Sequence, residues 1–377
     1  MTASAVIVGR GPAGLLSTEL LMEGGYQVTI VAEADGTLAM WPGDLSFGKE
    51  AISYLEFPIR LGKEEWAKKF SWFEAIMDNI GVAMLRAGGN SIPKTVTAIG
   101  LPRPTYSYPS WLYASVEVED LIFIGIGGLA DSIPEAQAAS YTRISGKLAC
   151  GATLARPPGW TSDWGALRFA SFLDQPDGAE WLAAGLQSAL KGLPEGFPIL
   201  LPQVIGLENT IPILSQLTNL LGRRVAEYPL VSPSISGVRI RDRWLERLRA
   251  AGVRFLSGSV ARATPDGELE LSDGRSLNPD LVVLATGGVL GGGITIELDT
   301  RAIDKISNRQ LGVVESLDDL DSIGHLDPYP IGGNQVVTVG RQAGGWSPDR
   351  NQCGGAMLLA TVTEALNPLL GGKVEAI

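Results

Sequence analysis

The sequence predicts an α/β protein with a parallel sheet at its centre, and three observations support this fold class. A continuous apolar run at residues 5–9 leads through a glycine-rich turn into a helical pattern from Pro12 to about Glu23. Apolar runs of the same kind occupy residues 28–31, 281–286 and 336–340. Many of the 47 glycines stand in short clusters beside these runs. Such runs are typical of strands buried on both faces, and such glycines mark sharp turns or close approach of the backbone to a ligand.

The first of these segments has the order strand, turn, helix, strand. Leucines at 15, 16, 20 and 21 lie near helical spacing, and Gly24 and Gly25 follow as a helix stop. This order is the opening half of a dinucleotide-binding unit. We therefore expect a Rossmann-like FAD/NAD(P)-binding three-layer fold with an inserted cap or substrate domain. Right-handed crossovers then bring the glycine turns together at the carboxyl edge of one sheet.

The second half of the chain supplies further elements of this fold. Apolar spacing predicts a helix over residues 238–251. The stretch 268–277 predicts a hairpin that turns at Asp273 and Gly274. The last apolar strand is followed by a glycine-rich loop and a closing helix from about Cys353 to Asn367.

Composition excludes several classes of function. The net charge of −11 argues against nucleic acid or an anionic membrane surface as a direct partner. Two cysteines, Cys150 and Cys353, are too few to ligate an iron–sulfur cluster or a structural zinc alone. The single histidine, His325, excludes a metal site built from several histidines. We therefore expect no metal site in this chain.

The pattern of apolar residues also bears on location. The chain enters its first strand without a basic segment and a long apolar stretch before it, so we expect no secretory signal. The longest apolar runs, such as Leu121 to Leu129, are short and glycine-rich for a membrane span. We expect a cytoplasmic protein with no direct membrane insertion, whose membrane contacts come through a partner.

Gly9, Gly11 and Gly14 form a G-x-G-x-x-G pattern between the first strand and the first helix. The first glycine allows a tight turn, the second lets a phosphate approach the backbone, and the third lets the helix pack against the strand. Pro12 and Ala13 open the helix, whose N–H groups and dipole favour an anion. The pattern predicts a nucleotide phosphate site. The alternative is a glycine-rich turn without a ligand.

The acidic residue that usually follows the second strand is displaced. The spacing usual in dinucleotide-binding units, counted from Gly14, places this acid at position 32, which is Ala32. Glu33 comes one residue later. This acid normally holds the adenosine ribose. Either Glu33 points away and the site takes a mononucleotide, FMN, or the loop shifts and Glu33 holds the ribose of FAD.

Two later segments resemble cofactor-contacting parts of flavoproteins. An apolar strand ends in Ala285, Thr286 and Gly287, an A-T-G pattern found where two-dinucleotide-fold flavoproteins return to the cofactor domain. The alternative is an ordinary strand-to-loop turn. Near the C-terminus a strand delivers Gly340, and Gly354 and Gly355 open the last helix, whose N–H groups can stabilise negative charge on a reduced flavin.

The candidates for direct chemistry are few. Arg341 stands where many flavoproteins have Asp; it cannot accept from ribitol hydroxyls but can pair with a phosphate. Asp349 and Arg350 lie in the loop that faces the expected flavin, with a solvated loop as the alternative. Arg341 and Arg350 are therefore the catalytic candidates. We expect packing for Cys353 and a surface or structural role for His325.

These motifs define the expected domains. The flavin-binding Rossmann-type domain is expected to comprise residues 1–48, 236–288 and 336–377. Cap, substrate or partner-facing regions are expected at 49–235 and 289–335, with 120–145 as a stretch that can return to the flavin domain. Within the cap, residues 146–235 show one strand candidate, at 197–202.

Several segments together resemble one family, the B subunit of the anaerobic glycerol-3-phosphate dehydrogenase. They occur in the same order over much of the chain: VIVGRGPAGLL, WPGDLSFG, FIGIGGLADSIPEAQAAS, LRFASFLD, ILLPQVIGLEN, PLVSPSISGVRIRDRWLERLRAAGVRFLSG, VLATGGVLGGGI and VGRQAGGWSPDRNQCGGAM. SPSISGVRIRDRW and QCGGA are the most specific of these. Arg341 and Ser347 depart from the pattern expected in the family.

The resemblance implies a flavin, FMN with FAD as the alternative, and two partners: a larger FAD-containing dehydrogenase subunit and a membrane-attached iron–sulfur subunit. It implies that electrons from oxidation of sn-glycerol 3-phosphate to dihydroxyacetone phosphate pass to quinone, with this chain in the cytoplasm at the inner membrane face. The site residues that it implies, beside those above, are Gly43, Asp44, Leu45, Ser46 and Gln352.

Two other hypotheses remain open at this stage. The inserted regions exceed what a flavin core needs, which favours a self-sufficient FAD-dependent dehydrogenase or oxidase of a small alcohol or amine. The missing acid at Ala32 and the change at Arg341 favour a flavin-free structural subunit.

Overall fold

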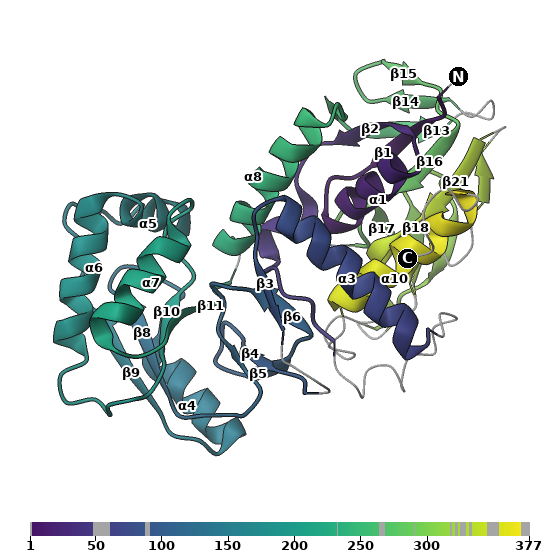
Figure 1. Cartoon of the computed structure of the whole chain (residues 1–377). Helices are drawn as coiled ribbons and strands as arrows, with labels where there is room; N and C mark the ends of the chain where they lie inside the picture. Colours follow the sequence, from purple (N-terminus) through teal and green to yellow (C-terminus); the bar gives the residue numbers. More distant parts are fainter. Residues whose placement is uncertain are drawn as a thin grey trace. The chain divides into compact units, whose positions relative to one another are not determined.

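The fold is described from a computed structural model of the chain (Figure 1). It describes residues 2–47, 61–86, 91–231, 233–263, 268–289, 291–316, 319–320, 323–324, 329–331, 334–344 and 354–370.

The chain divides into two compact units. Unit 1 consists of Met1–Leu38, Lys49–Gly81 and Asp242–Ile377, and unit 2 of Ala39–Gly48 and Val82–Arg241. These boundaries differ from the expected ones, because residues 61–81 and the stretch after 288 join the unit that holds the first sheet. The 41–46 loop, which is expected in the domain of the first glycine turn, belongs to unit 2.

Unit 1 is built on a six-stranded sheet in the order β12-β2-β1-β16-β21-β20. Its strands are β1 (Ser4–Val8), β2 (Gln27–Ala32), β12 (Arg254–Ser257), β16 (Leu281–Leu284), β20 (Tyr329–Ile331) and β21 (Asn334–Thr338). Every pairing is parallel except that of β20 with β21. The predicted α/β fold with a parallel sheet is confirmed, since the continuous apolar runs form its buried strands.

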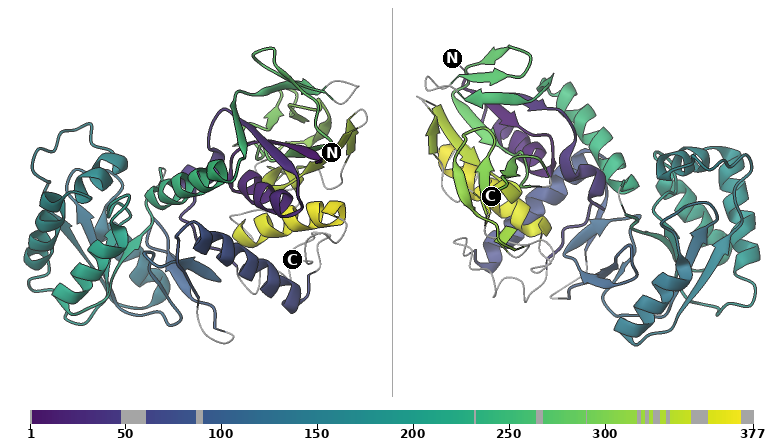
Figure 2. Two further views of the ribbon diagram at one scale, coloured as in Figure 1. Left: turned by 45° about the horizontal axis from the view of Figure 1, so that its top comes forward. Right: turned by 180° about the vertical axis from the view of Figure 1, so that it is seen from behind.

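Helices cover one face of this sheet and small antiparallel sheets cover the other. The helices are α1 (Pro12–Glu23), α3 (Lys63–Asn79), α8 (Ile235–Ala250), which crosses the unit boundary, and α10 (Gly354–Leu366). Figure 2 shows α10 alongside α1 and α3, and it packs against both. Glu19 of α1 is buried and accepts hydrogen bonds from Trp244 and Arg247 of α8, which ties α8 to α1.

The other face of the parallel sheet is covered by strands, which form the third layer of the fold. A hairpin sheet, β13 (Val260–Ala263), β14 (Leu269–Leu271) and β15 (Ser276–Leu277), turns at Gly274 as predicted. Its Leu269 and Leu271 pack against Val6, Val282 and other valines of the parallel sheet. A second small sheet comprises β17 (Ile294–Ile296), β18 (Arg301–Asp304) and β19 (Gln310–Val313). Short 3-10 helices are η1 (Gly36–Met40), η3 (Gly340–Ala343) and η4 (Asn367–Leu370).

Unit 2 contains a second parallel sheet. The sequence predicted its strand at 197–202, which is confirmed as β10 (Ile199–Pro202), but not the sheet as a whole. Its strands β8 (Leu121–Ile126), β9 (Ala149–Leu154), β10 and β11 (Val225–Tyr228) are ordered β11-β10-β8-β9 and all pairings are parallel. Its helices are α4 (Pro134–Ser145), α5 (Ala166–Leu173), α6 (Pro176–Ala189) and α7 (Thr210–Leu221). The stretch 120–145 therefore does not return to the sheet of unit 1, because β8 forms the centre of this one.

The strand order of unit 2 is that of a doubly wound sheet. The chain passes from β8 to β9 on one side and then returns past β8 to β10 and β11. With right-handed crossovers, α4 covers one face and α6 and α7 cover the other (Figure 1). The switch point lies between β8 and β10. Unit 2 also carries short antiparallel strands: β3 (Met84–Arg86), β4 (Lys94–Val96), β5 (Pro102–Pro104), β6 (Ser107–Pro109) and β7 (Ala114–Ser115).

Candidate functional site

The glycine turn between β1 and α1 is tightly packed at its first and third glycines. Gly9 has φ +113°, and a Cβ there would lie 2.3 Å from the carbonyl oxygen of Ala285. A Cβ on Gly14 would lie 2.1 Å from the carbonyl oxygen of Gly9. These two positions hold strand β16 against β1 and helix α1 against its own turn, so side chains are excluded there on steric grounds.

The second glycine is different. Among the described residues, the nearest atom to a Cβ on Gly11 is the amide nitrogen of Thr37, at 4.0 Å. Gly11 is the N-cap of α1 with an extended backbone (φ −78°) and no side-chain cap. The first intrahelical bond is from the Leu15 N–H to the Gly11 carbonyl, so the N–H groups of Ala13 and Gly14 precede it. Open space beside bare helix N–H groups is the geometry that accepts a phosphate.

An ion pair stands next to this turn. Arg10 donates from Nε to Oδ1 of Asp35 at 2.7 Å, and its Nη2 lies 2.6 Å from the same oxygen. Asp35 follows β2, so the pair links the glycine turn to the segment after the second strand. Glu33 also follows β2 directly, and it is exposed. The carboxylate that faces the turn is therefore Asp35, a residue that was not predicted from the sequence.

The C-terminal part of unit 1 meets the same turn. Gly340 has φ +66°, and a Cβ there would lie 2.7 Å from the Cβ of Ala13. Its N–H donates to Thr361 Oγ1 of α10 at 2.9 Å. The start of η3 thus packs against the first turn of α1. Gly354 and Gly355 form the first residues of α10 as predicted. Segments from the two ends of the chain are brought together here.

The carboxyl end of β16 is held by a buried polar chain that was likewise not predicted. Gln342 of η3 is fully buried, and its Oε1 accepts from Thr286 Oγ1 at 2.5 Å and from the Thr286 N–H at 3.3 Å. Its amide nitrogen donates to Oδ2 of Asp304, which is also fully buried. No local pattern marks Gln342, because Asp304 lies 38 residues away in β18.

Arg341 makes a contact within unit 1. Its Nη2 donates to the carbonyl of Leu320, and its side chain lies against Gly288. This contact fixes the guanidinium by the loop before β20. A role for Arg341 at a phosphate or in catalysis stays a prediction.

The 41–46 loop lies within unit 2. The buried carboxylate of Asp44 accepts at 2.6 Å from Arg103 of β5. Leu45 exchanges backbone hydrogen bonds with the strand region at Tyr106 and Ser107, and Ser46 is buried. Gly43 has φ +90°, and a Cβ there would meet Ile240 and Pro109. The predicted role of this loop beside the flavin is not tested by these contacts.

The carboxyl edge of the second parallel sheet is occupied by the side chains of unit 2. After β10, the carboxylate of Asp174 accepts from the N–H groups of Leu207 and Asn209 at 2.7 and 3.0 Å, in the loop that leads into α7. Beside them, Arg239 and Glu227 form a fully buried ion pair at 2.6 Å. A carboxylate held next to a helix start repels a phosphate.

The same edge is closed near β8. The hydroxyl of Tyr228 lies 3.0 Å from Ser132 Oγ, in the loop that follows β8. Burial raises the pKa of Tyr228 well above its usual value, which keeps this hydroxyl neutral. The switch point of unit 2, where ligands bind in many doubly wound sheets, is thus filled by internal contacts.

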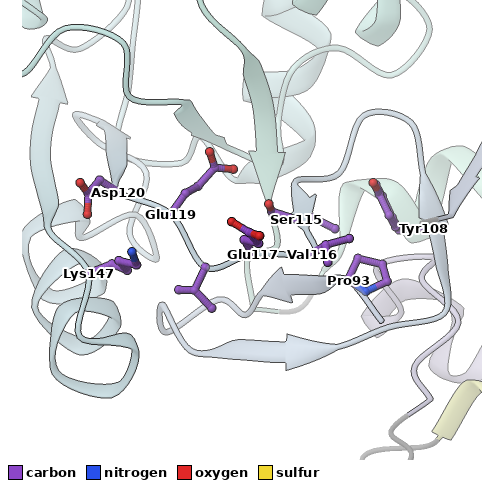
Figure 3. A pocket seen from close by; sticks show the side chains of 10 residues that line it. Pro93, Tyr108, Ser115, Val116, Glu117, Glu119, Asp120 and Lys147 are labelled. Carbon is purple, nitrogen blue, oxygen red and sulfur yellow. The ribbon is translucent and has the colours of Figure 1, made fainter. Parts of the chain in front are cut away.

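A cavity of about 630 Å³ lies elsewhere in unit 2 (Figure 3). Its rim carries the carboxyl groups of Glu117, Glu119 and Asp120 and the single ammonium of Lys147. Tyr113 donates to Glu119 at 2.8 Å, and burial together with this carboxylate raises the pKa of Tyr113. The excess of negative charge makes this cavity unsuited to a phosphate ester.

Several predicted residues lie outside the described residues. They are His325, Asp349, Arg350, Gln352 and Cys353. Within the described ranges, no group of three His, Cys, Asp or Glu side chains is placed to hold a metal ion. Nor does any helix of the described part combine the length and apolar character needed to cross a membrane.

Comparison with known proteins gives sequence relatives but no match to a family model. The B subunit of a probable anaerobic glycerol-3-phosphate dehydrogenase of Halobacterium salinarum is 29% identical over 223 residues, 53% of this chain and 51% of that protein. The B subunit of the anaerobic glycerol-3-phosphate dehydrogenase of Yersinia enterocolitica is 25% identical over 292 residues, 70% of this chain and 68% of that protein.

The chain is similar to the B subunit of anaerobic glycerol-3-phosphate dehydrogenase. The resemblance predicted from the sequence is confirmed. The matched region spans about half the length of the halobacterial relative.

Three stretches that carry this likeness meet inside unit 2. Ser234 Oγ lies 3.0 Å from the Trp41 carbonyl and 2.9 Å from Gln203 Oε1. Ser236 Oγ donates to the Pro42 carbonyl at 2.7 Å. These contacts join the WPGD loop, the segment after β10 and the start of α8. The three stretches therefore contribute to the packing of unit 2.

Solved structures with a related arrangement are distant. A 2-methyl-3-hydroxypyridine-5-carboxylic acid oxygenase mutant is 11% identical with a TM-score of 0.37, covering 100% of this chain and 84% of its own. Iminodiacetate oxidase from Chelativorans sp. BNC1 is 11% identical with a TM-score of 0.32, covering 96% and 95%. Likenesses at this level say nothing about the substrate of this chain.

Proposed function

We propose that this chain is the flavin-containing subunit of an anaerobic glycerol-3-phosphate dehydrogenase, with the flavin phosphate at the β1–α1 turn. The observation that carries the proposal is the contrast within one turn. Gly9 and Gly14 are needed for packing, whereas a Cβ on Gly11, beside the first N–H groups of α1, would meet no described atom nearer than the Thr37 amide nitrogen at 4.0 Å. The names of the relatives support the type of enzyme.

The residues of the turn fit the chemistry of a flavin nucleotide. The N–H groups of Ala13 and Gly14 would bind the phosphate, assisted by the dipole of α1. Thr286 and Gly340 lie at the carboxyl ends of the neighbouring strands β16 and β21, on the same edge of the sheet. When bound, a flavin accepts an electron pair and passes electrons on singly.

We propose FMN rather than FAD as the cofactor. The carboxylate of Glu33 is exposed after β2, and that of Asp35 is paired with Arg10, which competes with an adenosine ribose for it. An adenosine ribose would need a carboxylate that can accept from its hydroxyls. The isolated phosphate of FMN does not.

The proposed assembly follows from the resemblance to the B subunit. A larger FAD-containing subunit would oxidise sn-glycerol 3-phosphate, and this chain would relay the electrons to an iron–sulfur subunit and quinone. Attachment to the inner membrane face would come through these partners. The acidic cavity of unit 2 opposes a phosphate ester, which supports substrate oxidation in the partner.

Cofactor content of the purified full chain tests the proposal. The protein is denatured, and the released flavin is identified by chromatography and absorbance. FMN at close to one per chain is the expected result. FAD would show that another group holds the ribose. Absence of flavin after reconstitution would leave a structural subunit and end the proposal.

A second candidate is a self-sufficient oxidase of a small amine, favoured by the acidic cavity. Carboxylates at Glu117, Glu119 and Asp120 suit a cationic substrate. Turnover of amines by the isolated chain with a dye acceptor would establish this function. Lack of turnover, together with recovery of a complex that contains an iron–sulfur subunit, would favour the relay.

A further inference from the structure

The buried chain Asp304–Gln342–Thr286 fixes the direction of its hydrogen bonds. Oδ1 of Asp304 accepts from the N–H groups of Ile306 and Ser307 at 3.0 and 2.7 Å and from Ser307 Oγ at 2.9 Å. Its Oδ2 accepts from Gln342. A carboxylate surrounded by donors in this way is an acceptor only.

The orientation of Gln342 follows from that of Asp304. The amide nitrogen of Gln342 must face the carboxylate, because an amide oxygen there would meet a second acceptor. Its Oε1 must then face Thr286 and accept from it. Thr286 consequently donates its hydroxyl proton to Gln342 Oε1, at an oxygen–oxygen distance of 2.5 Å.

Thr286 itself stands at the ligand edge. It follows β16, two residues after the strand end, and remains partly exposed, whereas Gln342 and Asp304 are fully buried. The glycine-rich loop packs closely around it, since a Cβ on Gly293 would lie 2.0 Å from Thr286 Oγ1. The hydroxyl is held in one place, and because its proton goes to Gln342, it can only accept a hydrogen bond from a further partner.

We propose that Gln342 is a positioning residue that makes Thr286 a hydrogen-bond acceptor toward the bound cofactor. The inference rests on the proposed flavin site and deepens it. The partner of Thr286 is then a hydrogen-donating group of the flavin: the N3–H of the ring or a ribityl hydroxyl. A ligand that offers only acceptors at this point is disfavoured.

The test compares FMN binding to the full-length apoprotein across matched variants. Thr286→Val removes the acceptor at nearly constant shape, and Thr286→Ser retains it. Asp304→Asn keeps the three contacts at Oδ1 but presents an amide N–H to Gln342. The Gln342 side-chain amide can then flip, so that its oxygen accepts from Asn and its nitrogen donates to Thr286. The Thr286 hydroxyl would then be a donor toward the ligand. Thr363→Val in α10 is the control, because its buried hydroxyl bonds only to α10 carbonyls among the described residues.

We expect Thr286→Val and Asp304→Asn to weaken FMN binding by about tenfold, the loss of roughly one hydrogen bond. Thr286→Ser should bind within about threefold of the unmodified chain, and Thr363→Val should bind normally. N3-methyl-FMN distinguishes the N3–H from a ribityl hydroxyl as the donor, because it lacks the N3–H. Weakened binding to the unmodified chain identifies N3–H, and normal binding that still depends on Thr286 identifies a ribityl hydroxyl.

The inference and the proposed function fail in different ways. If the unmodified chain binds FMN but Thr286→Val binds it as well as Thr363→Val does, the acceptor role is wrong. The same holds if Thr286→Ser is as weak as Thr286→Val, because the serine hydroxyl would then not rescue binding. If the unmodified chain binds no flavin at all, the proposed site itself is wrong.

Discussion

The carboxyl edges of the two parallel sheets differ in the groups that lie beside the helix that starts there. In unit 1 the edge beside α1 is lined by backbone, and a Cβ on Gly11 would meet no described atom nearer than the amide nitrogen of Thr37, at 4.0 Å. In unit 2 the edge beside α7 is occupied, because Asp174 binds the N–H groups of the loop that leads into the helix and Arg239 pairs with Glu227. Both sheets have the topology that places ligands at this edge. Topology alone therefore does not locate a site.

The difference lies in what meets the helix N-termini. A helix start with no carboxylate beside it attracts an anion, whereas a carboxylate held next to a helix start, as Asp174 is beside α7, repels one. A nucleotide should therefore bind at α1 of unit 1 and not at α7 of unit 2. Three substitutions sharpen this comparison, and they are ordered by the size of the effect that we expect.

The largest effect should come from breaking the buried pair in unit 2. Arg239→Met leaves the Glu227 carboxylate buried without its cation, since neither side chain is exposed. We expect unit 2 to lose about 3–5 kcal/mol of stability in urea unfolding of the full chain. Arg262→Met is the control. It removes an ion pair whose arginine side chain is 65% exposed and should leave the stability nearly unchanged, because solvent screens this pair. Equal effects would show that the buried pair does not hold this edge.

A smaller loss should follow removal of the carboxylate that holds the loop before α7. Asp174→Ala frees the N–H groups of Leu207 and Asn209, and we expect a cost of about 1–2 kcal/mol in unfolding, the size expected when backbone donors lose a charged acceptor. Flavin binding should not change. Asp177→Ala, an exposed position nearby, should cost no more than about 0.5 kcal/mol. A flavin affinity that fell with Asp174→Ala would place the ligand in unit 2 after all.

The smallest effect concerns the ion pair at the glycine turn. Asp35→Asn releases Arg10 from its carboxylate partner, so the guanidinium becomes available to a bound phosphate. FMN should bind up to about fivefold more tightly, and the gain should shrink as salt is added. Glu33→Gln should leave binding unchanged. Titration with FAD checks the alternative: if either variant weakens FAD binding, that carboxylate holds the adenosine ribose.

Much of unit 1 could be predicted from the sequence because its signals are local. The run at residues 5–9, the helix from Pro12 to Glu23 and the hairpin turn at Gly274 appear in the structure close to the predicted places. Buried parallel strands are continuous apolar runs, and a glycine turn before a leucine-rich helix has few alternative structures.

The second sheet was missed for the opposite reason. Strand β9 reads ACGATL and is only partly buried, and β11 reads VAEY with the charged Glu227 inside. Neither resembles an apolar run, and the burial of Glu227 depends on Arg239, which lies in a different element, α8. Gln342 and Asp35 were missed for the same reason, since each is defined by a partner in another element.

The central claim, that the flavin phosphate binds at Gly11, is tested most directly by one pair of variants. Gly11→Val and Gly165→Val both place a branched side chain at an extended, uncapped helix N-cap that has room for it among the described residues. Both variants therefore share the cost to the helix, but only Gly11 borders the proposed site. FMN titration should show a loss of about 100-fold for Gly11→Val, roughly 2.7 kcal/mol, and none for Gly165→Val. Equal affinity of the two folded variants for FMN would contradict the account.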